Sequence, residues 1–372
     1  MIALSALAGQ ELVLTMTELA MLLAVPEDAW VDVSTARDAA GLARLATSGL
    51  VVSESGDGQL AEYRRREAQL RAPAWNRNAA VFHAMTRWSG VRSSPTPVRQ
   101  SRDPDRWPPP KHFHDRPVIQ STRLPVPGGH GDLYEVLGQR RTTVRGFAPE
   151  AAVSLDQLST ILHWVWGCHG TRVISPGELT LVRKTSPSGG AQHPTEVYPL
   201  VRNVPGVEPG LYHYDVEHHA LGLLDGLAGQ DLIELNNGLL ADQSHFASAP
   251  VVFYVTCRFA RTFWKYPRHA KAFKVVLFDA AHLSQTLQLV CAQMQLGSFV
   301  TAAFNEVDVD RLLGVQEFTE GSLLALGCGH PANPTHEPVY EPVVGSPDGR
   351  TFKRLRGSAR SWRKWVPPAR PR

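Results

Sequence analysis

Strand and helix patterns alternate along residues 130–331, without the regular strand–helix–strand repeat of a parallel sheet. Residues 211–214 and 221–224 have the composition of a β-hairpin, and a proline precedes a continuously apolar strand over 251–257. A last strand is expected over 322–328. Because no strand is followed by Gly-x-Gly-x-x-Gly, a dinucleotide-binding parallel domain is disfavoured. This order of elements predicts an α+β sandwich.

Two segments of this region have the three- and four-residue apolar spacing of buried helices. The first begins with a capping box of Ser154 and Gln157 and ends at Gly167. The second is expected from Asp279 to a stop at Gly297. Their predicted buried stripes are Leu155, Leu158, Leu162 and Val165 in the first, and Ala280, Leu283, Leu287, Val290 and Met294 in the second. The second stripe could pack within its own subunit or against a partner.

The composition changes along the chain and predicts four parts. Residues 1–92 read as a winged-helix-like unit: a helix over 17–24, a second from an N-cap at Ser34 to Ala46, then a strand pair around residues 50–58. Prolines gather in residues 93–129, which predicts an extended crossing segment. Residues 130–335 form the main domain, and 336–372 form a basic tail, read as solvated in preference to binding an acidic peptide leader.

Composition also narrows the classes of function. A net charge of +3 is too small to indicate nucleic-acid binding, and the longest apolar runs are shorter than a membrane span. The four cysteines lie far apart, which predicts reduced thiols in a cytoplasmic protein. The paired histidines lack cysteine or carboxylate partners nearby, so no metal site is expected.

The first candidate site is the arginine segment, residues 141–147. Arg141, Thr142, Thr143 and Arg145 place two guanidinium groups around two hydroxyls. Such a set could bind a phosphate through bidentate, charge-assisted hydrogen bonds. The alternative is a basic turn that packs against an acidic surface.

The second candidate is the shelf loop, residues 187–194, which lies between two strand-like runs. Its functional residues are expected to be Pro187, Ser188, Gly189, Gly190 and Gln192. Adjacent glycines let the main chain approach a flat ligand closely, and a proline at each end stiffens the loop. The serine and glutamine side chains could add hydrogen bonds at the rim. An ordinary surface loop is the alternative.

The third candidate is the pair Lys265 and Tyr266, which follows the buried strand. Arg261, Trp264 and Arg268 lie nearby in the sequence. Basic and aromatic surroundings favour the neutral amine that a general base needs. An exposed lysine–tyrosine pair in a loop is the alternative.

In this order, the three candidates resemble motifs of the nitroreductase superfamily, and more closely those of SagB-type dehydrogenases, which mature ribosomally made peptides. The family's R-R-S-x-R-x-F is similar to residues 141–147, with Thr142 at the second arginine. Its P-S-A-G-A-L-Y-P-x-E resembles residues 187–196, with Gln192 and His193 in place of leucine and tyrosine, and its K-Y pair matches Lys265–Tyr266. Further similarities are G-L-Y-H-Y at 210–214, R-A-Y-R at 271–274, D-A-G-H-x-x-Q at 279–285 and L-G-x-P at 326–331.

The resemblance covers residues 130–331 and implies a nitroreductase-like sandwich, in which helices flank a mostly antiparallel sheet. It implies a homodimer with FMN at the interface. Arg141, Thr142, Thr143 and Arg145 would bind the phosphate and ribityl chain, and Pro187, Ser188, Gly189, Gly190 and Gln192 would line the ring. Lys265 and Tyr266 would act on the substrate.

The implied reaction is the oxidation of thiazoline or oxazoline to thiazole or oxazole in a modified precursor peptide. A cyclodehydratase or another maturation enzyme is an expected partner. One alternative is a flavin reductase acting on a nitro, quinone or dehydroamino-acid substrate. The other is a degenerate flavin-fold protein that only binds a peptide or a partner enzyme.

Overall fold

The computed structural model describes residues 1–26, 29–33, 38–72, 75–92, 132–175, 179–227, 229–267 and 269–332. The chain divides into two compact units: Met1–Ser94 with Gln139–Asn333, and Pro95–Gly138 with Pro334–Arg372. The described part of the second unit lies in helix α5 (Asp132–Gln139). The predicted crossing segment and basic tail lie outside the described residues, and the predicted domain boundaries remain predictions.

The core of the first unit is a six-stranded antiparallel sheet with the order β7-β6-β5-β8-β10-β9. Its strands are β5 (Thr195–Val201), β6 (Gly210–Asp215), β7 (Ala220–Asp225), β8 (Val251–Arg258), β9 (Gly297–Thr301) and β10 (Glu320–Gly329). Strands β5 and β10 flank β8, which is buried from Val251 to Cys257. The predicted hairpin, buried strand and final strand are therefore confirmed as β6–β7, β8 and β10.

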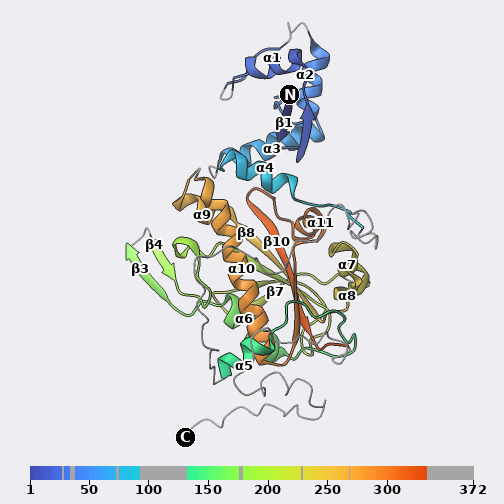
Figure 1. Ribbon diagram of the computed structural model, residues 1–372, viewed down its shortest axis with the longest axis vertical. Helices are drawn as coiled ribbons and strands as arrows, with labels where there is room; N and C mark the ends of the chain where they lie inside the picture. The colour runs from blue at the N-terminus through green and yellow to red at the C-terminus, as the bar shows by residue number, and fades with distance from the viewer. Residues whose placement is uncertain are drawn as a thin grey trace, which may run out of the picture. The chain divides into compact units, whose positions relative to one another are not determined.

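Helices cover both faces of this sheet. α6 (Leu155–Trp166) and α10 (Ala270–Gln293) contact each other and pack on one face, where α10 crosses the sheet (Figure 1). α7 (Leu232–Leu239), α8 (Ser244–Ala247) and α11 (Glu306–Leu313) pack on the other face. Alternate β8 side chains enter the two cores, as a pleated strand requires: Phe253 enters the first and Tyr254 the second. The predicted α+β sandwich is confirmed.

Helix α6 begins with the predicted capping box. Ser154 Oγ accepts from the Gln157 amide at 3.1 Å, and Gln157 Oε1 accepts from the Ser154 amide at 2.9 Å. Most of its predicted stripe is buried, but Leu155, at the first helical position, is 47% exposed. The buried stripe therefore begins one turn later than predicted.

Helix α10 begins nine residues before its predicted start. His269 is the N-cap, and its Nδ1 accepts from the Lys271 amide at 3.1 Å. The eight residues before Asp279 contain no glycine or proline, and Phe273 and Val276 bury their side chains there. Tertiary packing thus extends the helix through a part that lacks the predicted spacing, and Asp279 lies mid-helix.

The apolar stripe of α10 packs inside its own subunit. Leu283 and Leu287 belong to the core between α6 and the sheet, so the alternative of a partner-facing stripe is wrong for these residues. Among the described residues, α10 is also the one helix long and apolar enough to cross a membrane. Its contacts with α6 and the sheet are those of a core helix.

The N-terminal elements differ in order from the prediction. A hairpin of β1 (Ile2–Ser5) and β2 (Gln10–Val13) comes first. Four helices follow: α1 (Met16–Ala24), α2 (Ala39–Thr47), α3 (Gln59–Arg71) and α4 (Arg77–Met85). The helix over 17–24 is confirmed, but α2 is capped by Asp38, and the predicted cap, Ser34, lies outside the described residues.

The predicted strand pair around residues 50–58 is wrong, and with it the order that suggested a winged helix. Gly49 has φ +67°, and the amides of Leu50 and Val51 donate to the Leu45 carbonyl at the end of α2. These amides are therefore used by the helix terminus and cannot form a strand ladder.

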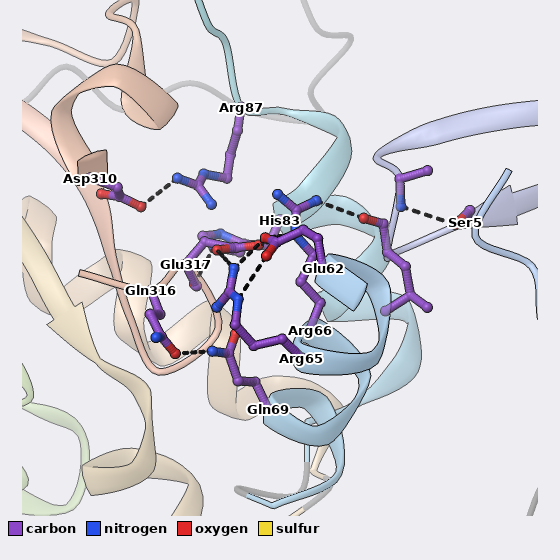
Figure 2. A network of polar contacts seen from close by, with 12 residues as sticks. Ser5, Glu62, Arg65, Arg66, Gln69, His83, Arg87, Asp310, Gln316 and Glu317 are labelled. Atoms are coloured by element: carbon purple, nitrogen blue, oxygen red, sulfur yellow. Dashed lines mark hydrogen bonds and ion pairs between the residues drawn. The ribbon is translucent and has the colours of Figure 1, made fainter. Parts of the chain in front are cut away.

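Helices α3 and α4 join the sheet domain through a polar network at the turn between α11 and β10 (Figure 2). Glu317 forms ion pairs with Arg65 at 3.8 Å and Arg66 at 2.6 Å, and its carbonyl accepts from His83 Nε2 at 3.0 Å. Burial lowers the pKa of His83 to about 3, so this imidazole is neutral and donates. Arg87 forms a buried ion pair with Asp310.

The same junction contains a carboxyl group with a raised pKa. Glu306 Oε2 accepts from the Trp88 amide at 2.9 Å, and burial raises the pKa of Glu306 from 4.5 to about 7. The folded state therefore binds this proton more tightly than the unfolded state, and stability falls as pH rises from 4.5 to about 7.

Glu306→Gln keeps the acceptor for Trp88 but removes the buried charge. We expect the variant to be more stable than the parent at pH 8, on the order of 1 kcal/mol, with a flatter pH dependence between pH 4.5 and 7. Urea unfolding at several pH values measures this. Glu150→Gln, at an exposed position, is the control. If the free energy of unfolding of Glu306→Gln falls with pH as steeply as that of the parent, the raised pKa does not belong to Glu306.

Candidate functional site

The shelf loop follows the hairpin β3 (Thr171–Ser175) and β4 (Leu179–Val182) and contains one 3-10 turn, Gly189–Ala191. Asp279, buried in the middle of α10, holds this turn. Its carboxylate accepts from Ser188 Oγ at 2.6 Å and from the Gly189 amide at 3.0 Å. Burial raises the pKa of Asp279, and these two donors oppose that effect.

Further hydrogen bonds brace the loop from within. Ser188 Oγ accepts from the His193 amide at 2.9 Å, and Gln192 Nε2 donates to the Gly190 carbonyl at 2.9 Å. His282 Nδ1 lies 3.3 Å from the Pro187 carbonyl. The Ser188 and Gln192 side chains thus hold the loop in shape, and their contact with a ligand at the rim remains a prediction.

Both glycines of the loop are required by their surroundings. Gly190 has φ +64°, which side chains disfavour, and a Cβ at Gly189 would lie 2.0 Å from Val275 Cγ1 of α10. A Cβ on Gly190 would lie 2.7 Å from the Tyr266 hydroxyl and 3.0 Å from Lys265 Nζ. The loop therefore packs closely on α10 on one side and on the lysine–tyrosine pair on the other.

Lys265 ends helix α9 (Phe259–Lys265), and Tyr266 is its C-cap. Lys265 Nζ donates to the Gly190 carbonyl at 3.0 Å and lies 5.9 Å from the centroid of the Tyr266 ring. Lys265 is exposed and Tyr266 half-buried, so both are accessible to a substrate. The structure thus brings together two of the three predicted sites. The predicted neighbour Arg268 lies outside the described residues.

A cationic cluster lies behind the shelf loop. Arg261 Nε donates to the Gln192 carbonyl at 2.9 Å. Burial, together with Lys184 and Arg261, lowers the pKa of His193 to about 4, so this imidazole is neutral near pH 7. Burial also lowers the pKa of Lys184. His193 can thus act as a neutral hydrogen-bonding group in this loop but not as a cation.

The arginine segment contacts a different face of α10. Gln288 Nε2 donates to the Thr142 carbonyl at 2.8 Å, and the Val144 amide donates to the Ser298 carbonyl of β9 at 2.9 Å. Nine residues separate Gln288 from Asp279, which is about two and a half helical turns. The shelf loop and the arginine segment of one chain therefore lie on opposite sides of α10.

Sequence reasoning missed Asp279, Gln288 and Lys184. Asp279 and Gln288 are buried polar residues that stand next in sequence to Ala280 and Leu287 of the predicted apolar stripe, and a polar residue beside such a stripe is a signal of a specific buried hydrogen bond. Lys184 gives no comparable signal, because its burial depends on how the loop folds. Within the described residues, no group of three or more histidine, cysteine or carboxylate side chains could hold a metal ion.

Comparisons with known proteins agree with this architecture. The Nitroreductase family profile matches residues 138–330, just over half of the 372-residue chain. The trifolitoxin-processing protein TfxB of Rhizobium leguminosarum bv. trifolii is 31% identical over 176 residues, which cover 46% of this chain and 46% of TfxB. The nitroreductase homologue MJ1384 of Methanocaldococcus jannaschii is 31% identical over 188 residues, covering 50% of this chain and 86% of MJ1384.

Among solved structures, a chain of the E. coli microcin synthetase McbBCD complex, with truncated pro-MccB17 bound, is similar in fold. Its TM-score is 0.51 at 19% identity, and the match covers 68% of this chain and 91% of that one. The match to TfxB spans less than half of that protein's length. From the family profile and the match to most of MJ1384, the chain belongs to the nitroreductase family.

Proposed function

We propose that this protein is an FMN-dependent dehydrogenase that oxidises thiazoline or oxazoline rings in a ribosomally made peptide. One observation carries the proposal: Lys265 and Tyr266 contact the shelf loop at Gly190. A base and a hydroxyl thus lie where a flat cofactor on the shelf would meet its substrate. A simple flavin reductase has no need of such a base.

The residues present fit a flavin. Gly190 has no side chain, so its backbone alone lies beside the Tyr266 hydroxyl. A Cβ built on Gly190 would lie 2.7 Å from that hydroxyl oxygen. The neutral His193 and the cations Lys184 and Arg261 lie at the same loop and suit the electron-rich pyrimidine edge of a flavin ring. Arg141 and Arg145 supply guanidinium groups for a single phosphate, which favours FMN.

The chemistry removes one proton and one hydride from the ring. The Lys265 amine takes the Cα proton, and the Tyr266 hydroxyl orients that amine or relays the proton. A bound FMN would supply the acceptor for the hydride that leaves Cβ. The Cα–Cβ single bond of the ring becomes a double bond, which completes the aromatic azole, and the substrate loses two electrons and two hydrogens in all.

We also propose a homodimer that shares its flavin sites. In one chain the shelf loop and the arginine segment lie on opposite sides of α10, whereas a flavin needs ring and phosphate contacts together. A second copy can supply the missing half to each site. The names of TfxB, a trifolitoxin-processing protein, and of the McbBCD complex, a microcin synthetase with truncated pro-MccB17 bound, support a precursor peptide as substrate and a second maturation enzyme as partner. We propose that this partner is a cyclodehydratase and that both act in the cytoplasm.

An absorption spectrum of the purified protein tests the proposal. We expect a yellow protein that releases FMN on heating, identified by mass. FAD, or a colourless protein, would contradict it, and the colourless result would favour a degenerate peptide-binding protein. Added NAD(P)H separates the remaining alternative: rapid bleaching of the flavin would indicate a reductase.

A further inference from the structure

A groove of about 290 Å³ lies between α4 and α10. It is lined by Asn76, Asn78, Ala79, Phe82, Phe273, Lys274 and Leu277. Phe82 is 56% exposed and Leu277 38%, so the groove presents apolar surface to solvent. Among these lining residues, Lys274 alone carries a charge.

The segments around the groove are entirely free of acidic residues. Residues 68–92, which include α4, contain no aspartate or glutamate, and neither do residues 243–278, which include α9 and the first turns of α10. Lys271 lies one turn before Lys274, and both are exposed. Within the described part of the chain, neither lysine forms an ion pair. Neither segment therefore contributes a carboxylate that would repel an anionic partner, whereas the two exposed lysines would attract one.

The groove adjoins the catalytic face. Val275, the residue after Lys274, contacts Gly189 of the shelf loop. Consecutive residues of a helix point about 100° apart, so the groove and the shelf flank the same turn of α10. A chain bound in the groove would thus enter the site from one side.

We propose that this groove binds an acidic peptide segment whose apolar side chains fill the space between Phe82 and Leu277. The inference rests on the proposed function, in which the substrate is a peptide, and assigns recognition to a part of that peptide outside the reacting ring. Helix-lined grooves of this kind take two or three apolar anchors from a partner, and the surrounding charge selects its sign.

Two other occupants fit the observations less well. A twofold dimer contact would place Lys274 and Lys271 of one copy against the same positive surface of the other, which is unfavourable. A nucleic acid needs many cationic contacts to its phosphates. The lining of this groove offers one cation, Lys274, and three large apolar side chains, Phe82, Phe273 and Leu277.

The test uses the full chain with its flavin and a fluorescein-labelled amphipathic probe peptide, with leucines at i, i+3, i+4 and i+7 and glutamates elsewhere. We expect fluorescence anisotropy to show that the probe binds, with an affinity that falls as the salt concentration rises. Lys274→Glu should weaken it at least about tenfold, and Leu277→Ser several-fold, with flavin content unchanged. Arg172→Glu, at an exposed position of β3, is the charge-matched control and should bind as the parent does.

Several outcomes would overturn the proposal. These are equal binding of a peptide with lysines in place of the glutamates, parent-like affinity in Lys274→Glu, stronger competition by single-stranded oligothymidine, or dissociation of a dimer by Leu277→Ser in light scattering. Because binding is measured without turnover, these results are independent of the azoline reaction. A flavin-free or inactive protein that still binds the probe through Lys274 would refute the proposed function alone.

Discussion

Lys265→Ala is expected to lower the rate of peptide oxidation by about a hundredfold or more while leaving the flavin bound. The Cα proton of an azoline is only weakly acidic, and a positioned base contributes on this order. Lys265 Nζ lies 3.0 Å from the Gly190 carbonyl, at the edge of the shelf loop, where a substrate over the flavin would present that proton. Single-turnover bleaching of the flavin by an azoline peptide measures the chemical step directly.

Two further variants separate the base from a positioning role. Lys265→Arg keeps a donor for the Gly190 carbonyl but cannot lose its proton, so it should be as slow as the alanine variant. If Lys265 only braced the loop, arginine would restore the rate. Tyr266→Phe should be milder if the hydroxyl only orients the amine, and Arg311→Ala controls for loss of a surface cation. Near-parent turnover by flavin-loaded Lys265→Ala would rule out this base.

The sequence pattern predicted the parts of the fold that depend on local periodicity. The β6–β7 hairpin, the buried strand β8 and the Ser154–Gln157 capping box follow from spacing over a few residues, and all three are confirmed. The sequence predicts the lysine–tyrosine pair and the shelf loop as separate features, and 75 residues separate Lys265 from Gly190. Their contact depends on how β8 and α9 place Lys265 beside Gly190, which no local pattern contains.

The errors arose where distant contacts outweigh local pattern. The apolar spacing does not predict the first turns of α10. Phe273 and Val276 are buried there by contacts with α4 and α9, which lie elsewhere in the sequence. The strand expected at residues 50–52 is absent because the end of α2 takes up its amides. The spacing predicts Asp279 at the start of a helix, whereas in the fold its carboxylate accepts hydrogen bonds from Ser188 and Gly189, about 90 residues away in the sequence.

A mixed dimer of two variants is expected to bind flavin although neither variant does so alone. Gly190→Ala should abolish flavin binding, because the new Cβ would lie 2.7 Å from the Tyr266 hydroxyl at a φ of +64°. Arg141→Ala combined with Arg145→Ala should also abolish it by removing the phosphate contacts. If each site takes its shelf loop from one copy and its arginine segment from the other, a heterodimer of the two variants contains one intact site and one doubly defective site.

Co-expression with two different affinity tags isolates that heterodimer. We expect it to hold about half the FMN per chain of the parent and about half its activity, although each variant alone holds almost none. A site built within one chain gives no such rescue, since each subunit would then carry one defect. Colourless heterodimers, or a flavin-loaded monomer in light scattering, would contradict the shared site. The opposite faces of α10 occupied by Asp279 and Gln288 are the reason to expect rescue.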